Sequence, residues 1–285
     1  MKLIRFGEVG QEQPGLLLED GTRIDTSAFG EDYNEAFLAS DGITRLKTWA
    51  EANAASAPKV DESIRWAAPI TRPGNIVCIG LNYQEHAAES GLELGDEPPI
   101  FFKASSSYSG PFDDVRIPKG SVKTDYEVEL GVVVGKPLRN VTLDNFMDFI
   151  AGFVLFNDYS ERRMQLETSG QWAKGKGCDT FSPVGPFLAT PDEMGDLDTI
   201  RLWLKVNGEM RQDIDTSHLI MDIPHTMVML SGYMSLLPGD LISTGTPPGV
   251  GLGFDPPKYL KPGDVVEYGI DGLGEARQTL VGSED

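Results

Sequence analysis

The feature that most constrains the fold is a series of short runs of β-branched and apolar residues, each bounded by glycine or proline. Short runs with such boundaries are typical of β-strands rather than helices. The sequence therefore predicts a mixed, β-rich α+β fold. The expected strands are Asn75–Ile79, Ile100–Lys103, Tyr126–Val134, Phe153–Asn157, Ile200–Val206, Asp240–Ser243 and Asp264–Ile270.

Helices are expected at only three places in the main part of the chain: Asn82–Ser90, Asn145–Ile150 and Ile223–Ser235. In the third of these, Pro224 falls in the first turn, where the missing N–H would have no partner in any case. The chain contains no internal repeat and no low-complexity tract. A single large domain with few helices is the simplest organisation.

The first part of the chain has a different character. It combines short alternating segments with a helical stretch from Gly42 to Ala55 that is rich in alanine, lysine and glutamate. A stretch dense in proline and glycine, Pro69–Gly74, follows and indicates a connection. We therefore expect a small N-terminal α/β domain over residues 1–69 and a catalytic domain over residues 70–285.

The charge balance excludes some classes of partner. Asp and Glu number 44 against 24 Lys and Arg, a formal net charge of -20, which would repel nucleic acids and anionic membranes. No stretch approaches the roughly 18 apolar residues that a membrane span needs, and the first residues lack the apolar run of a secretory signal. Cys78 and Cys178 are too few for a disulfide framework. These observations predict a cytoplasmic protein.

Glu127 and Glu129 form the most informative local pattern. They are two residues apart in an expected strand, and because side chains alternate along a strand, both carboxylates project from one face. Two ionised carboxylates so close together favour a cation between them, and oxygen ligands suit Mg²⁺, Mn²⁺ or Ca²⁺. Two solvated acids on an exposed strand face are the alternative.

Asp158 follows the apolar run Gly152–Asn157, where a strand leaves the core, and it is a candidate for a third oxygen ligand. Its alternative is a helix cap, because Asp158–Glu161 precedes a polar stretch with helical character. His86 and Glu89 are three residues apart and share one face of the helix expected at Asn82–Ser90. Such a pair can deprotonate water near neutral pH, or be an ordinary polar pair on the surface.

Two loops complete the candidate site. Gln171–Asp179 is rich in glycine and carries Lys174 and Lys176, where a cation would face an anionic substrate, although loop lysines are usually solvated. Ser243–Gly251 combines hydroxyls and glycines at a strand exit, and it suits binding of a carboxylate through backbone N–H groups and threonine side chains.

These segments occur together and in this order in the fumarylacetoacetate hydrolase family, and the chain resembles the shorter acylpyruvase branch of that family over about residues 70–280. The resemblance implies the β-sheet roll or sandwich of the family's C-terminal domain, preceded by a small N-terminal domain. The matching segments are Ile76–Tyr83, His86 with Glu89, Glu127–Leu130, Phe156–Asp158, Lys176, Asn207–Gln212 and Thr244–Gly251.

Carried over residue by residue, the resemblance implies three groups of site residues. The metal ligands for one Mg²⁺ or Mn²⁺ are Glu127, Glu129 and Asp158; the catalytic residues are His86, Glu89 and Lys176; the substrate contacts are Lys103, Gln171 and Thr246. The chain departs from the family pattern at Leu81, where some acylpyruvases carry an arginine, and at Ala104, where many members have a proline. It also lacks a large apolar lid segment in Gly91–Pro99.

The implied activity is hydrolysis of a carbon–carbon bond in a 2,4-diketo acid of the 2,4-diketo-3-deoxy-L-rhamnonate or L-fuconate type. Water activated by His86 and Glu89 attacks C4, the C3–C4 bond breaks, and Mg²⁺ and Lys176 hold the departing pyruvate enolate. The resemblance also implies a homodimer or homotetramer. Oxaloacetate decarboxylation and keto-acid tautomerisation are the enzymatic alternatives, and a catalytically silent, acidic metal-binding scaffold is the alternative from another class.

Overall fold

A computed structural model describes residues 1–91, 95 and 97–283. Its largest element is a ten-stranded sheet in which every neighbouring pair is antiparallel except β17 and β5. In order across the sheet its strands are β3 (Arg23–Asp25), β2 (Gln13–Leu17), β1 (Lys2–Phe6), β14 (Leu188–Ala189), β11 (Ile150–Asn157), β10 (Val128–Val134), β17 (Leu241–Ser243), β5 (Ile76–Ile79) and β6 (Ile100–Lys103), with β4 (Trp66–Ala67) paired to β1.

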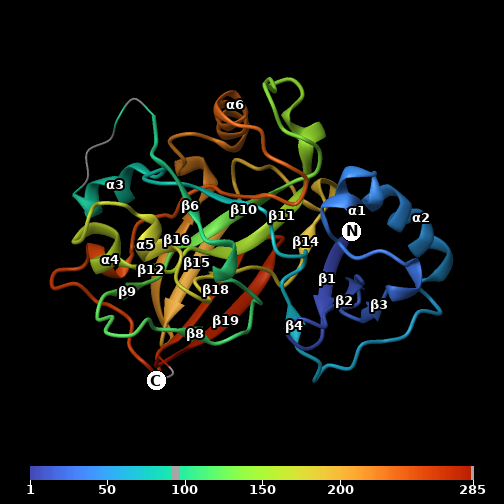
Figure 1. The fold of residues 1–285 in the computed structure, drawn as a ribbon, viewed down its shortest axis with the longest axis horizontal. Coiled ribbons are helices and arrows are strands. Elements are labelled where there is room, and N and C mark those ends of the chain that lie inside the picture. Colours follow the sequence, from blue (N-terminus) through green and yellow to red (C-terminus); the bar gives the residue numbers. More distant parts are fainter. Residues whose placement is uncertain (92–94, 96, 284–285) are drawn as a thin grey trace.

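A five-stranded sheet lies against this one (Figure 1). Its order is β16 (Glu209–Asp215), β15 (Arg201–Val206), β18 (Val265–Ile270), β19 (Gly274–Val281) and β8 (Val115–Arg116). Two small pairs complete the strands that the structure describes: β12 (Ser160–Glu161) with β9 (Thr124–Asp125), and β13 (Ser182–Pro183) with β7 (Tyr108–Ser109).

The helices are short and lie around these sheets (Figure 1). The α-helices are α1 (Glu35–Ala39), α2 (Gly42–Asn53), α3 (Gln84–Ser90), α4 (Arg162–Leu166), α5 (Ala173–Lys176) and α6 (Ile223–Tyr233). The 3₁₀ turns are η1 (Ser27–Phe29), η2 (Ser105–Ser107), η3 (Phe146–Phe149), η4 (Pro191–Glu193), η5 (Thr216–His218) and η6 (Gly251–Gly253). The prediction of a β-rich α+β fold with few helices is confirmed.

Strands β10 and β11 are buried on both faces, and alternation divides their side chains between two cores. Leu130 and Val132 pack between the two sheets with Phe153 and Leu155. Val133 and Val154 face the opposite way and pack with residues of the N-terminal segment. Because both faces of these strands are buried, their sequences are continuous apolar runs rather than alternating ones.

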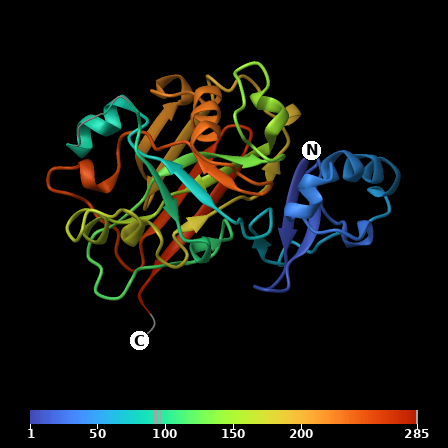
Figure 2. The same cartoon turned by 45° about the horizontal axis from the view of Figure 1, so that its top comes forward.

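The N-terminal part of the chain, drawn in blue, forms a lobe at one side of the molecule in Figure 1 and Figure 2. The lobe is nevertheless joined to the rest by backbone pairing, because β1 pairs with β14 at Lys2 and Leu3. A bidentate ion pair between Arg65 and Asp113 adds a second link, with Nε–Oδ1 at 2.7 Å. The division at residue 70 stays a prediction.

The expected elements differ from the observed ones at several places. The helices α4 and α5 were not among the expected helices. The strand expected over Tyr126–Val134 begins two residues later, since β10 spans Val128–Val134. The helix expected at Asn145–Ile150 is only the 3₁₀ turn η3, because Ile150 already pairs with Val134 in β11. Strands β16 and β19 were not expected, since their exposed faces carry charged residues and they contain few β-branched ones.

Candidate metal centre and active site

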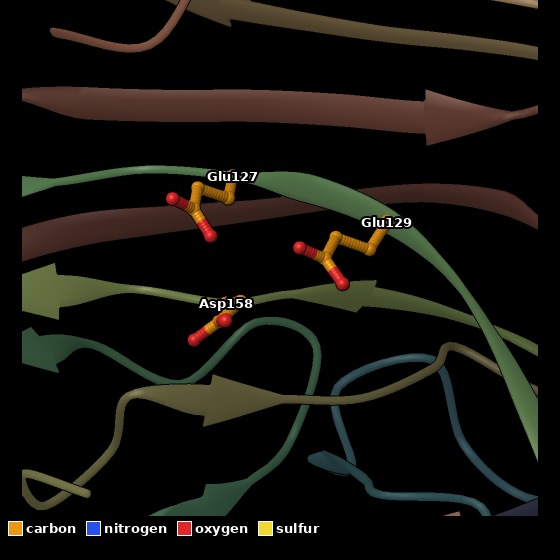
Figure 3. Close-up of side chains that lie close together, drawn as sticks. All are labelled: Glu127, Glu129 and Asp158. Atoms are coloured by element: carbon orange, nitrogen blue, oxygen red, sulfur yellow. The ribbon is translucent and has the colours of Figure 1, made fainter. Parts of the chain in front are cut away.

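The three acids expected as metal ligands lie together at the ends of β10 and β11. The antiparallel register places Val128 opposite Asn157, so Glu127, just before β10, lies beside Asp158, just after β11. The N–H of Asp158 donates to the carbonyl of Glu127 at 2.8 Å, and this hydrogen bond holds the two residues side by side. Figure 3 shows Glu127, Glu129 and Asp158 pointing into one space, and their ligand oxygens all lie within 4.8 Å of one another.

Burial decides between the interpretations left open for these acids. Glu127 is 4% exposed, Glu129 is 2% exposed and Asp158 is fully buried, so none of them belongs to a solvated strand face. Asp158 does not cap a helix either. The cap of α4 is Glu161, whose carboxylate accepts from the N–H of Arg163.

Two buried lysines neutralise part of this negative charge. Lys176, at the end of α5, places Nζ 2.6 Å from Oε2 of Glu127 and 2.7 Å from Oδ2 of Asp158. Lys103, at the end of β6, places Nζ 2.5 Å from Oδ1 of Asp158 and donates to the carbonyl of Tyr159 at 3.0 Å. Burial lowers the pKa of Lys176, but the two carboxylates outweigh it, and the net shift is upward.

Arg162 is a third buried cation, which the sequence did not reveal. Its Nη2 lies 2.7 Å from Oε1 of Glu127, and its Nε donates to Oδ2 of Asp125 at 2.8 Å. The side chain lies at the start of α4, four residues after Asp158. Nothing in Glu161–Arg163 distinguishes a buried arginine from a solvated one. Only the approach of β9 to β12 brings Arg162 under the carboxylates.

Glu129 differs from its neighbours because it has no cation within ion-pairing distance among the described residues. Its carboxylate accepts from the hydroxyl of Ser243 and from the N–H of Gly245, at 3.0 Å for the latter. Burial, together with the charges of Asp158 and Glu127, raises the pKa of Glu129 well above its usual value. Burial also acts to raise the pKa of Glu127, but the positive charges of Lys176 and Arg162 outweigh burial, and the net shift of this pKa is downward.

The donor set fits a divalent cation. Four buried carboxylates, with Asp125 as the fourth, face the three buried cations Lys103, Arg162 and Lys176. The three cations leave one negative charge uncompensated. Glu129 is the carboxylate of this group that accepts hydrogen bonds only from neutral donors. Carboxylate oxygens at such close spacing are ligands that Mg²⁺ and Mn²⁺ accept readily. The residues that would hold the ion are Glu127, Glu129 and Asp158.

His86 and Glu89 form a close pair on α3. His86 Nδ1 lies 2.9 Å from Oε1 of Glu89, and His86 is only 5% exposed, so the pair is not a surface one. The loop after β17 holds the carboxylate of Glu89, because the N–H of Gly249 donates to both of its oxygens at 3.1 and 3.0 Å. Gly253, in η6, packs so closely that an added Cβ would lie 2.5 Å from Oε2 of Glu89.

A small cavity of about 20 Å³, roughly the room that one water needs, lies between His86 and the acids Glu127 and Glu129. Five expected site residues line it: His86, Glu127, Glu129, Lys176 and Thr246. The other lining residues are Ile79, Gly80, Leu81, Phe101, Arg162, Gln165, Leu166, Trp172 and Leu252. The catalytic and metal-binding residues predicted from separate motifs therefore meet at one place.

The three expected substrate contacts have different surroundings. Thr246 lines the cavity, and its Oγ1 donates to the carbonyl of Val128 while accepting from Nε2 of Gln212 at 2.8 Å. Lys103 is bound to Asp158 and is not among the lining residues. Gln171 is exposed, and its neighbour Trp172 lines the cavity instead. The lid segment considered at Gly91–Pro99 falls partly outside the described residues.

Residues 75–281 match the family model described as the C-terminal domain of fumarylacetoacetate (FAA) hydrolase. The chain belongs to the fumarylacetoacetate hydrolase family. The match covers the whole of the site, from β5 through the triad to the loop that holds Glu89. No helix in the part of the chain that the structure describes is long and apolar enough to cross a membrane.

Relatives and solved structures agree with this assignment. A protein from Burkholderia multivorans, named only as a hydrolase, is 47% identical over 279 residues and covers 98% of both chains. The maleylpyruvate hydrolase of Sphingobium sp. SYK-6, solved with manganese(II) and pyruvate, is 29% identical, with a TM-score of 0.82 over 100% of both chains. A probable 2-hydroxyhepta-2,4-diene-1,7-dioate isomerase from Mycobacterium abscessus is 32% identical, with the same TM-score and coverage. The family thus includes hydrolases and isomerases, and at least one member binds a divalent metal.

Proposed function

We propose that the protein is a Mg²⁺-dependent hydrolase of a carbon–carbon bond in a 2,4-diketo acid. The observation that carries this proposal is that His86, paired with Glu89, lines the same cavity as Glu127 and Glu129 of the buried carboxylate triad. Hydrolysis of a 1,3-dicarbonyl needs both parts, because water has to be activated and the departing carbon has to be stabilised as its charge develops.

A divalent cation held by Glu127, Glu129 and Asp158 would draw electron density from the substrate's 2-keto group. At the same end of the cavity, Lys176 and Arg162 carry positive charge that attracts the substrate's 1-carboxylate. Thr246 adds a hydroxyl to this wall. These groups orient the substrate with its carboxylate toward the triad.

The His–Glu pair lies where water is to be activated. The contact between His86 and Glu89 fixes the orientation of the imidazole. His86 takes a proton from water, the water oxygen adds to C4, and the C3–C4 bond breaks. C3 leaves with the bonding electrons and is then protonated to give pyruvate, while C4 becomes the carboxyl carbon of the second product.

For the substrate, we propose a 2,4-diketo-3-deoxy-L-rhamnonate or L-fuconate type acid, cleaved to pyruvate and a hydroxy acid such as lactate. The support is the resemblance of the sequence to hydrolases of such sugar acids. A homodimer or homotetramer and a cytoplasmic location stay predictions of the same kind.

The test is pyruvate release from L-2,4-diketo-3-deoxyrhamnonate, coupled to lactate dehydrogenase and NADH, first with Mg²⁺ and then with excess EDTA. Rapid release that EDTA abolishes is the expected result. Release from acetylpyruvate but not from the sugar acid would keep the reaction and discard the substrate. Failure to release pyruvate from any 2,4-diketo acid would contradict the proposed reaction.

The second candidate is isomerisation or decarboxylation of a keto acid, and the structural similarity to an isomerase supports it. These reactions use the same electron withdrawal at the keto group but need no attack by water. Oxaloacetate decarboxylation that persists in a His86→Ala variant lacking hydrolysis would favour this candidate. A silent metal-binding scaffold predicts no turnover with either class of substrate.

A further inference from the structure

Each cation that lines the cavity forms ion pairs with the buried carboxylates around the proposed metal site. Lys176 contacts Glu127 and Asp158, and Arg162 contacts Asp125 and Glu127. The third basic residue, His86, is paired with Glu89. Among the described lining residues, no other side chain carries positive charge. The 1-carboxylate of a diketo acid therefore meets cations, but a second carboxylate at the far end of the substrate would not.

The remainder of the wall is mostly apolar. Its side chains are Ile79, Leu81, Phe101, Leu166, Trp172 and Leu252, with Gln165 as a neutral polar group. Phe101 and Trp172 pack edge to face, with ring centroids 5.3 Å apart. Placing an ionised carboxylate against such a wall without a partner has a large desolvation cost. A neutral group of the same length has no such cost.

Leu81 lies between the cavity and a neighbouring groove, because it lines both. The other side of the groove is the segment Leu219–Asp222. The side chain of Asn82 holds that segment next to Leu81, since its Nδ2 donates to the carbonyl of Met221 at 2.9 Å. Leu81 has a φ of +53°, a conformation that a bulky residue rarely adopts. A substrate tail that extends past Leu81 would enter this groove.

The groove also lacks a cation for a second carboxylate. Its described charged residues are Glu97 and Asp222, and its one basic residue, His225, has Nδ1 only 2.6 Å from Oδ1 of Asp222. The sequence from Gly91 to Pro99 contains no lysine, arginine or histidine. An anionic substrate tail would therefore meet negative charge here rather than positive charge.

We propose that the substrate carries its only negative charge at the 1-carboxylate, and that its far end is an uncharged group in contact with Leu81. This inference rests on the proposed function, and it concerns the substrate class of that same site. It separates this chain from enzymes that act on dicarboxylates such as maleylpyruvate.

Binding is measured first, because it does not depend on turnover. The Mg²⁺-loaded protein is titrated by calorimetry with 2-oxoheptanoate and with 2-oxoheptanedioate, which have the same chain length and differ in the terminal carboxylate. We expect the monoacid to bind at least about 100-fold more tightly. Equal affinity, tighter binding of the dioate, or no binding of either acid would overturn the inference.

Leu81→Arg supplies the missing cation and should reduce the preference for the monoacid by about 10-fold or more. Leu252→Arg, on the same wall, is the second variant if Leu81→Arg fails to fold. Val9→Arg is the control, because it adds the same charge at a position 75% exposed in the N-terminal lobe. An equal change in Val9→Arg would attribute the preference to net charge and overturn the inference.

Turnover distinguishes failure of this inference from failure of the proposed function. Pentanoylpyruvate and succinylpyruvate are compared by pyruvate release, and the former should have the higher kcat/KM by about 100-fold. Cleavage of both at equal rates would contradict the uncharged end and keep the hydrolase. Selective binding of 2-oxoheptanoate without cleavage of any diketo acid would keep the uncharged end and contradict the hydrolase.

Discussion

Members of the carboxylate triad and of the His86–Glu89 pair line one cavity, but the two groups are held in different ways. The triad lies at the adjacent ends of the paired central strands β10 and β11, and three buried cations pair with Glu127 and Asp158. The pair lies on the seven-residue helix α3, and Glu89 is held by the backbone N–H of Gly249. The triad is therefore part of the folded core, whereas the pair is attached to it through a loop.

Substitutions in the triad and in the His–Glu pair should have different effects. Removing Glu127 or Asp158 leaves a buried cation without one of its partners, which affects stability, metal binding and activity together. Removing a member of the pair leaves the triad and its lysines in contact. We therefore expect substitutions in the triad to impair metal binding, and substitutions in the His–Glu pair to impair water activation while metal binding is kept.

Glu127→Ala should have the largest effect. Loss of a ligand that also pairs with Lys176 and Arg162 is expected to abolish Mn²⁺ binding and to lower kcat/KM by about 1,000-fold or more. Calorimetric titration with Mn²⁺ and pyruvate release measure the two effects. Retention of both metal affinity and activity would show that the triad is not the metal centre.

His86→Ala should come second. It is expected to lower kcat by roughly 100- to 10,000-fold, because a general base is lost, while Mn²⁺ affinity stays within about 3-fold of the native value. His218→Ala is the matched control, since His218 is exposed and contacts Glu85. A parallel loss of metal affinity in His86→Ala would break the separation between the two regions.

Gly253→Ala should have the smallest effect of the three, about 10- to 100-fold on kcat. The added Cβ would displace the carboxylate of Glu89 without touching the triad, so metal affinity should not change. Calorimetric titration with Mn²⁺ is the second readout, because a defect confined to the His–Glu pair leaves metal binding intact. Gly232→Ala, where an added Cβ meets nothing within 4 Å, is the control, and equal losses in both variants would refute a positioning role.

Local pattern was enough to indicate much of this protein. Alternation along a strand predicted that Glu127 and Glu129 share one side, and the end of the apolar run before Asp158 marked a strand exit. Helical spacing brought His86 and Glu89 together on α3. Each of these inferences concerns residues only a few positions apart, where backbone geometry alone sets the direction of side chains.

The sequence by itself thus determined the fold class, the family and the two clusters of chemistry, because periodicity and short motifs depend on local geometry. The tertiary structure alone decided which charges are compensated. Arg162 reaches Glu127 only because β9 pairs with β12, and Lys103 turns to Asp158 rather than lining the cavity. It also decided that Gln171 is exposed while Trp172 lines the cavity. Such contacts join residues tens of positions apart, and their geometry depends on how the strands and loops pack together.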